Sequence, residues 1–146
     1  MDLRGFENTS KLGEYAESEV MALFLKHGFE VLRPFGGSYR YDLCVGFDGV
    51  LLKVQVKVGK LHHGFVRFRR VSGGGTKRDP YKHYSKKQVD LFAIYCYELD
   101  KVYIVPFGEK VSQIRINEPK NNQKLGVHLA CDYEFDQERF MVFFKP

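Results

Sequence analysis

The stretch around Asp48-Gly49 constrains the fold of this chain more than any other part of its sequence. Residues 40–47 (RYDLCVGF) precede the dipeptide and residues 50–58 (VLLKVQVKV) follow it, and both runs are rich in β-branched and aromatic side chains. Asp-Gly between two such runs is typical of a two-residue β-turn, in which both residues adopt positive φ. The sequence therefore predicts a tight antiparallel hairpin at this point.

The predicted turn also fixes which side chains of the two strands face each other. Counting outward from the turn pairs Asp42 with Gln55 and makes Lys57 a diagonal neighbour of Asp42. A carboxylate, an amide oxygen and an ammonium group then converge on one face of the hairpin. An ordinary solvated face with a cross-strand Asp–Lys pair has the same pattern, so both interpretations stay open. The apolar residues of both strands alternate onto the other face: Leu43, Val45, Phe47, Val50, Leu52, Val54, Val56 and Val58.

Apolar periodicity outside the hairpin predicts a mixed α/β domain. A stripe of apolar residues at steps of three and four predicts a helix over residues 11–27, which Gly28 can end in a left-handed conformation. A turn is expected over residues 59–64. Apolar runs bounded by turn-forming residues predict further strands, the last two as a second hairpin, at 29–33, 65–71, 91–97 and 101–107.

The pattern after these strands is less regular. Residues 111–116 fit a strand or a helix, residues 125–135 are ambiguous, and residues 139–144 fit a buried strand or a docked tail. We interpret the chain as a single domain, because its 146 residues suit one domain. Within residues 1–146 we expect a core at about 11–107 and an accessory or oligomerisation segment at 108–146.

Cysteine content and hydropathy limit the class of protein. Three widely spaced cysteines without a C-x-x-C pair argue against a disulfide framework and a zinc knuckle. They indicate reduced thiols in a cytoplasmic protein. No apolar run approaches the roughly 20 residues of a membrane-spanning helix. Secreted, disulfide-rich and membrane proteins are therefore not expected.

Positive charge is concentrated in one segment of the chain. Residues 53–87 contain eleven basic residues and one acid, Asp79, so this segment carries +10 and the rest of the chain −5. Such a block inside a folded domain favours a polyanionic partner, although a solvated basic face is an alternative. Aromatic residues among cations can stack on bases or lie along a nucleic-acid backbone. The candidate contacts for such a partner, which would be DNA contacts in a DNA-binding protein, are Arg40, Lys60, Arg67, Arg69, Lys77, Arg78, Lys82, Tyr84 and Lys86.

The polar face of the hairpin offers oxygen ligands for a divalent metal ion. Mg²⁺ prefers carboxylate and carbonyl oxygens, so Asp42, the Gln55 amide and the Val56 backbone carbonyl are candidate ligands. The ammonium of Lys57 can orient or help deprotonate an attacking water and offset charge on a phosphate. The sequence therefore predicts the components of metal-assisted phosphodiester hydrolysis on this face.

The predicted helix can supply a second acid to this site. Its glutamates are Glu14, Glu17 and Glu19. At about 100° per residue, Glu14 lies well outside the apolar stripe, whereas Glu17 and Glu19 flank the stripe on opposite borders. Periodicity therefore does not choose between Glu17 and Glu19.

The order of these motifs resembles the PD-(D/E)XK nuclease superfamily. Three short motifs carry the likeness: GEYAE at 13–17, RYDL at 40–43 and QVK at 55–57. The first motif selects Glu17 as the acid of the helix. Tyr41 stands where proline gives the superfamily its name, and Gln55 replaces the acid of the last motif. QVK, YDL and the later VYIVP strand together are similar to the branch that holds the cyanobacterial group I intron homing endonuclease.

This resemblance implies a fold, an activity and a site. The expected fold is a mixed α+β nuclease core, with a central mixed sheet flanked by helices. The expected activity is Mg²⁺-dependent endonucleolytic cleavage of double-stranded DNA, with Mn²⁺ as a substitute ion. The implied metal ligands are Glu17, Asp42, Gln55 and the Val56 carbonyl. Lys57 would serve the nucleophile and complete the implied catalytic set.

The resemblance also bears on partners and on alternative functions. Cleavage of both DNA strands needs two active sites, so a homo-oligomer, either a dimer or a tetramer, is implied. One alternative is a structure-selective resolvase that cuts branched DNA at Holliday junctions. Another is a DNA-binding module of the same fold without cleavage. Gln55 keeps the second alternative open, because one carboxylate charge at the metal is absent.

Overall fold

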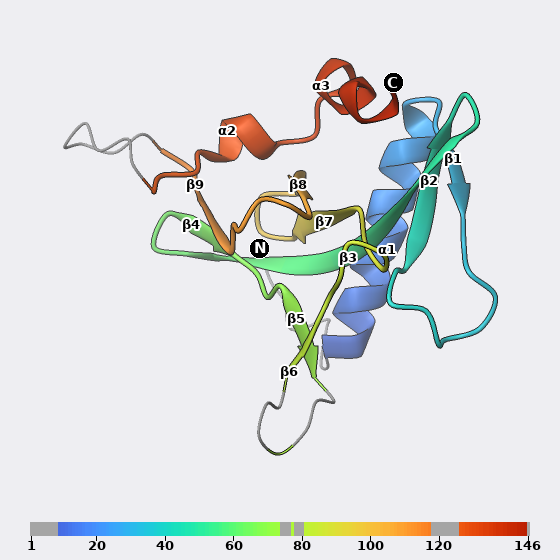
Figure 1. Ribbon diagram of the computed structural model, residues 1–146. Coiled ribbons are helices and arrows are strands. Elements are labelled where there is room, and N and C mark those ends of the chain that lie inside the picture. Colours follow the sequence, from blue (N-terminus) through green and yellow to red (C-terminus); the bar gives the residue numbers. More distant parts are fainter. Residues whose placement is uncertain (1–8, 74–76, 78–80, 118–125, 146) are drawn as a thin grey trace.

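The fold combines one long helix with a seven-stranded sheet. The computed structural model describes residues 9–73, 77, 81–117 and 126–145 (Figure 1). Within these ranges a separate two-stranded sheet and three short helical segments complete the molecule. The predicted fold class, a central mixed sheet with flanking helices, is confirmed.

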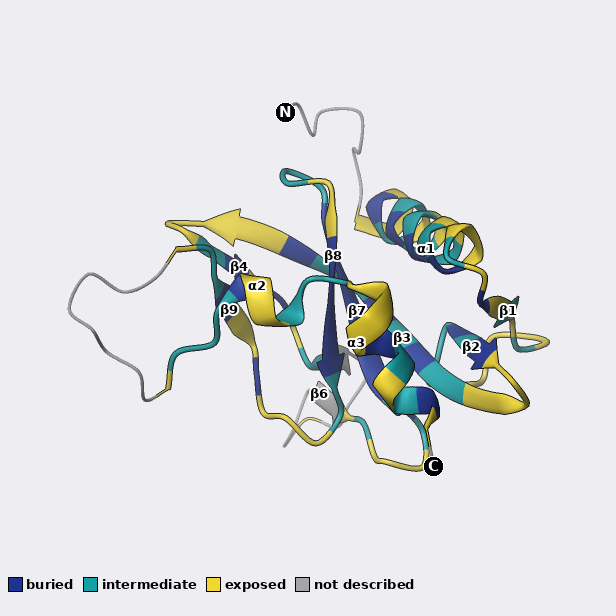
Figure 2. Ribbon diagram, turned by 90° about the horizontal axis from the view of Figure 1, so that it is seen from above, coloured by how far each residue is buried: buried dark blue, intermediate teal, exposed yellow. Residues whose placement is uncertain are grey.

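Helix α1 (Thr9–Lys26) packs along one face of the sheet (Figures 1 and 2). Its buried residues are spaced four apart and form the predicted apolar stripe: Leu12, Ala16, Val20 and Phe24. Gly28 follows the helix with a φ of 84°, a left-handed conformation that favours glycine. The predicted helix and its stop are thus confirmed. No helix among the described residues is long and apolar enough to cross a membrane.

The predicted hairpin is present at Asp48-Gly49. Strands β2 (Leu43–Phe47) and β3 (Val50–His62) join through this dipeptide, whose φ values are 50° and 81°. Phe47 pairs with Val50, as a two-residue turn requires. Strand β1 (Glu30–Leu32) continues the sheet beyond β2 in antiparallel pairing. The register that separates the polar and apolar faces is therefore the predicted one.

Strand β3 extends beyond its predicted end at residue 58. The turn expected over residues 59–64 is confined to His63-Gly64, and Gly59 lies inside the strand. A Cβ at Gly59 would lie 2.6 Å from Cγ1 of Val66 and 2.7 Å from Cγ2 of Ile94. Glycine is needed there because neighbouring side chains pack against the backbone, not because the chain turns.

The sheet is mixed because one of its central pairs is parallel. Strand β7 (Leu91–Cys96) runs parallel to β3, and β8 (Lys101–Pro106) pairs antiparallel with β7. All six residues of β7 are buried, as expected for a strand covered on both faces. Figure 2 shows β7 and β8 as the dark blue centre of the molecule. The predicted second hairpin is thus confirmed.

The remaining strands are three residues long and lie on the far side of β3. The strand predicted over 65–71 divides into two pieces, and the ambiguous segment at 111–116 contains a strand. These strands are β4 (Phe65–Arg67), β5 (Val71–Gly73), β6 (Tyr81–His83) and β9 (Gln113–Arg115). β4 pairs with the end of β3 and with β9, whereas β5 and β6 form the separate two-stranded sheet.

The C-terminal residues dock onto the core as helical turns. After α2 (Ala130–Tyr133), the chain forms α3 (Gln137–Met141) and a 3-10 turn, Val142–Phe144. The ring of Phe140 stacks 5.2 Å from that of Phe24 on α1. Of the two interpretations of residues 139–144, the docked tail is therefore correct and the strand is wrong. The Asp136 carboxylate caps α3 by accepting from the Arg139 N–H, which favours a helix locally.

Candidate active site

The candidate site lies where one edge of β3 has no strand beside it. β2 pairs with β3 as far as Val54, and β4 begins to pair at Lys60; between them, β7 is the only described strand bonded to β3. Asp42, just before β2, occupies this gap. Its backbone N–H donates to the Val54 carbonyl at 2.9 Å, and its Oδ2 accepts from the Val56 N–H at 2.8 Å. A carboxylate thus stands where another strand residue would continue the ladder.

The backbone carbonyl of Val56 opens on the same edge as Asp42. The N–H and C=O of a strand residue point to the same side, and Asp42 holds the N–H of Val56. Nε2 of Gln55 lies 3.5 Å from the Val56 carbonyl oxygen. Rotation of this amide about its last torsion would present its oxygen instead of its nitrogen. The structure therefore brings Asp42, Gln55 and the Val56 carbonyl together, and we call this place the open edge of β3.

Glu17 reaches the open edge of β3 from helix α1. Burial, followed by the hydrogen bond and charge of Asp42, raises the pKa of Glu17 from 4.5 to about 7. The guanidinium of Arg33, 3.9 Å from Glu17, opposes this shift. Glu19 instead lines a pocket elsewhere on α1 and hydrogen-bonds Tyr15. Of the two glutamates that periodicity left open, Glu17 is therefore the one that meets Asp42.

Lys57 projects from the face of β3 that points away from α1. Val56 packs into the core beneath α1, so alternation along the strand directs Gln55 and Lys57 to the other face. The Lys57 ammonium donates to the Tyr84 hydroxyl at 3.0 Å and to the Val71 carbonyl at 3.3 Å. The open edge thus receives Glu17 from the side of α1 and has the lysine on the other face of β3.

The donor set at the open edge consists of oxygen atoms. Two adjacent carboxyl groups, one with its pKa raised by burial and by the other carboxyl, are stabilised in their charged form by a cation. Carboxylate, amide and carbonyl oxygens together suit a hard divalent ion. No group of three or more His, Cys, Asp or Glu side chains in the described ranges is placed to hold a metal. A metal at this edge would therefore depend on Gln55 and Val56 in addition to Glu17 and Asp42.

Arg40 and Tyr84 are the predicted DNA contacts that lie beside the site. The guanidinium of Arg40 stacks 4.2 Å from the centre of the Tyr84 ring. Its Nη1 also donates to the His83 carbonyl at 3.5 Å. Arg40 precedes Asp42 by two residues, and Tyr84 contacts Lys57, so both halves of the site are linked through this pair.

Three further predicted DNA contacts line a groove of about 680 Å³. Lys60, Arg67 and Arg69 lie in it, between the β3–β4 hairpin and the first turns of α1. Positive charge from two neighbouring strands thus gathers on one concave surface. This is the arrangement expected of a surface that follows a phosphate backbone.

The other predicted contacts are more dispersed. Lys77 and Lys86 are exposed, and Lys86 forms an ion pair with Asp90 at 3.4 Å. Lys82 belongs to β6, but its side chain is outside the part of the chain that the structure describes. Arg78 also falls outside the described residues.

Two neighbours of the site were not predicted from the sequence. Arg33 pairs with Glu17, and the Val71 carbonyl accepts from Lys57. Each of these contacts joins segments that are distant along the chain. Neither residue lies in a motif, so no local pattern in the sequence indicates its role.

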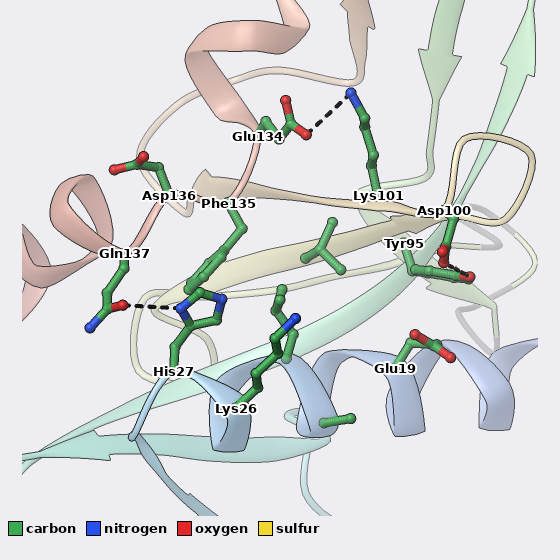
Figure 3. A pocket seen from close by; sticks show the side chains of 13 residues that line it. Glu19, Lys26, His27, Tyr95, Asp100, Lys101, Glu134, Phe135, Asp136 and Gln137 are labelled. Atoms are coloured by element: carbon green, nitrogen blue, oxygen red, sulfur yellow. Dashed lines mark hydrogen bonds and ion pairs between the residues drawn. The ribbon is translucent and has the colours of Figure 1, made fainter.

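A second polar cluster lies on α1 away from these residues. The α1–β8 pocket, of about 590 Å³, lies between α1, the start of β8 and residues 134–137 (Figure 3). None of the predicted site residues lines it. Six of its polar residues form three pairs: Tyr95 with Asp100 at 2.8 Å, Lys101 with Glu134 at 3.2 Å, and His27 with Gln137 at 3.0 Å.

Comparison with known proteins agrees with the motif order. The family model described as PD-(D/E)XK endonuclease matches residues 7–136, beyond the range that the motifs cover. The solved structure of a bacterial homing endonuclease, I-Ssp6803I, is similar over 93% of this chain and 93% of that chain, with a TM-score of 0.69 and 26% sequence identity. Because the family model covers most of the sequence, the expected family is confirmed. The chain belongs to the PD-(D/E)XK endonuclease family.

Proposed function

We propose that this endonuclease hydrolyses phosphodiester bonds of double-stranded DNA with the help of Mg²⁺, in the manner of a homing endonuclease. The observation that carries the proposal is the open edge of β3, where Asp42 meets Glu17 and accepts from the N–H of Val56, whose carbonyl opens on the same edge. Oxygen donors of this kind match the preference of Mg²⁺. The similar structure is that of a bacterial homing endonuclease.

In this proposal each group at the open edge has a separate task. Glu17, Asp42, the Gln55 amide oxygen and the Val56 carbonyl hold the divalent ion. When bound, such an ion polarises a phosphoryl oxygen and lowers the pKa of a coordinated water. The Asp42 carboxylate keeps its place because the Val56 N–H donates to it. The Lys57 ammonium orients the attacking water and offsets negative charge that develops on the phosphate.

The basic groups bring the DNA backbone to this edge. Arg40 and Tyr84 lie beside Lys57, and the groove with Lys60, Arg67 and Arg69 is a second positive surface, against the first turns of α1. Contacts of this type are sequence-independent and position the duplex, whereas base contacts specify the site. Cleavage of both strands needs a second active site, so we propose that the protein works as a homo-oligomer.

A second function is favoured by one observation, the amide at position 55. Gln55 directs its nitrogen toward the Val56 carbonyl, and it adds no negative charge to the site. With two carboxylates in place of three, the affinity for a divalent ion is reduced. The second candidate is therefore a protein that binds DNA through this fold and does not cut it.

One cleavage experiment distinguishes these functions. A pool of random-sequence linear duplexes and a four-way junction are incubated with the protein in Mg²⁺ or Mn²⁺, and the ends are sequenced. Cutting of duplexes at a preferred sequence supports the proposal, and cutting confined to the junction would assign a resolvase. Binding without cutting in either ion would favour the second candidate. Asp132→Ala, on the exposed surface of α2, is the control for loss of an aspartate elsewhere.

A further inference from the structure

The hydroxyl group of Tyr84 is the side-chain partner of the Lys57 ammonium. It accepts from Nζ of Lys57 at 3.0 Å, and Nζ lies 5.0 Å from the centre of the Tyr84 ring. The carbonyl of Val71 takes another of the ammonium protons at 3.3 Å. An ammonium group donates and never accepts, so these two acceptors determine where its charge is held.

The ring of Tyr84 is fixed in place from two sides. It packs edge-on against Phe92, with the ring centres 5.6 Å apart and the planes at 79°. Phe92 is fully buried between the strands and the loops that cover them. The guanidinium of Arg40 lies over the face of the ring, 4.2 Å from its centre, which is a favourable cation–π distance. Tyr84 is thus a rigid support with its hydroxyl directed at Lys57.

The hydroxyl also retains a proton that it can donate. Because Lys57 supplies the proton of the bond between them, the O–H of Tyr84 points elsewhere. Among the described residues, this hydroxyl makes no hydrogen bond other than the one from Lys57. A phosphate oxygen next to Lys57 would complete the arrangement, since it accepts from both groups.

We propose that Tyr84 is a positioning residue, which holds the Lys57 ammonium through its hydroxyl group for the phosphate of the bound DNA. This role rests on the proposed function, in which Lys57 serves the nucleophile. Tyr84 directly follows β6, so it also joins the two-stranded sheet of β5 and β6 to the site. The ring alone cannot perform this task, because the hydrogen bond needs the oxygen.

The first test is Tyr84→Phe, which removes the oxygen and keeps the ring between Phe92 and Arg40. With saturating DNA and Mg²⁺, we expect the single-turnover cleavage rate to fall about tenfold, the scale of one charge-assisted hydrogen bond. DNA affinity, measured in the Asp42→Ala background to prevent cutting, should change less than about twofold, because the hydroxyl carries no charge. Tyr133→Phe is the matched control, since its hydroxyl bonds His128 at 3.2 Å outside the site.

The second test asks whether Tyr84 acts through Lys57. If it does, the double variant Tyr84→Phe/Lys57→Ala should cleave no more slowly than Lys57→Ala alone, because residues that act as a unit are not additive. Losses that multiply would assign the hydroxyl to an independent DNA contact and overturn the proposal. An unchanged rate in Tyr84→Phe would overturn it as well.

A third measurement does not depend on cleavage. In protein labelled with ¹³C and ¹⁵N at lysine, the Lys57 signals are identified by their loss in Lys57→Ala. Tyr84→Phe should move the Cε and Nζ signals of Lys57 and make its side chain more mobile, whereas Tyr133→Phe should not. If the native protein cuts no DNA, the proposed function fails while this measurement still decides the role of Tyr84. Unaltered Lys57 signals would refute that role.

Discussion

Two polar clusters flank helix α1, and they differ in how closely opposite charges meet: Arg33 lies 3.9 Å from Glu17 in one, and Lys101 lies 3.2 Å from Glu134 in the other. At the open edge of β3, Glu17 lies against Asp42, and burial together with this neighbour raises its pKa to about 7. In the α1–β8 pocket, Lys101 pairs with Glu134 and Tyr95 donates to Asp100. Polar groups that are paired with each other stabilise the fold, whereas two adjacent carboxyl groups need a cation beside them to be charged at the same time. The comparison supports the proposal that the chemistry takes place at the open edge, and it favours a structural role for the pocket.

The contrast begins with two glutamates that are two residues apart. Glu17 and Glu19 both border the buried stripe of α1, but they turn to opposite sides of it. Glu17 meets Asp42, whereas Glu19 hydrogen-bonds Tyr15 and lines the pocket. Two residues correspond to a rotation of about 200° around the helix axis. This rotation separates a candidate catalytic acid from a structural one.

The largest expected effect is the loss of Asp42. Asp42→Ala should reduce cleavage below detection, because it removes both a metal ligand and the group that holds the edge of β3. Asp100→Asn is the matched change in the α1–β8 pocket, where asparagine tolerates the φ of 51°. We expect Asp100→Asn to cut at the normal rate in a gel assay. Full activity in Asp42→Ala at saturating Mg²⁺ would remove the basis for this site.

The second prediction concerns salt. If each protomer neutralises about six phosphates, the logarithm of DNA affinity should fall against log[salt] with a slope near −5, or about 10³-fold between 50 and 200 mM. Replacing Lys60, Arg67 and Arg69 by glutamine should reduce the slope by about three. Lys101→Gln removes a cation that is already paired with Glu134 and should leave the slope unchanged. A flat salt dependence in the native protein would exclude the basic groove as the DNA surface.

The third prediction concerns Lys57, one cation among many. Its removal should affect the chemical step far more than binding, because a single charge contributes little to affinity. Lys57→Ala should lower the cleavage rate at least about 10²-fold, the scale of a positioned catalytic group. Lys101→Ala serves as the control from the pocket. A loss confined to affinity, seen by comparing binding and single-turnover rates, would make Lys57 a phosphate anchor.

The local parts of this site could be predicted from the sequence, and the distant contacts could not. The turn at Asp48-Gly49 sets the register of the hairpin by itself, so the place of Asp42 near Gln55 followed from a dipeptide. The bond between Lys57 and Tyr84 joins residues 27 apart, and no spacing rule connects them. The prediction of a turn at Gly59 is wrong because the sequence does not distinguish a glycine required for close packing from a glycine required for a turn.

The fourth prediction uses the pKa of Glu17. Between pH 4.5 and about 7 the folded protein holds a proton that the unfolded chain has lost. The free energy of unfolding of the metal-free protein should therefore fall as pH rises through this interval, and this contribution is fully present only below pH 4.5. Denaturant unfolding across this range measures it. Glu17→Gln should remove the dependence, whereas Glu19→Gln should keep it.

The same proton opposes metal binding, which gives a second measurement. Below pH 7, each Mg²⁺ that binds must displace the proton of Glu17, so affinity should rise up to about tenfold per pH unit and then level off. Calorimetry in two buffers of different ionisation enthalpy counts the protons released. Absence of proton release at pH 6 would show that Glu17 does not bind the metal.

The smallest expected effect belongs to Gln55, and it decides between a cutting enzyme and a binding module. A neutral amide is a weaker ligand for Mg²⁺ than a carboxylate, but it still offers an oxygen. If the native site cuts DNA, Gln55→Glu should tighten metal binding with a modest change in rate, and Gln55→Ala should raise the Mg²⁺ requirement a few-fold. If the native site does not cut, only Gln55→Glu can restore activity, because it adds the missing charge. Gln137→Glu, in the α1–β8 pocket, adds the same charge elsewhere and should leave the Mg²⁺ dependence unchanged. Identical Mg²⁺ dependence in the native protein and both Gln55 variants would show that this side chain does not reach the metal.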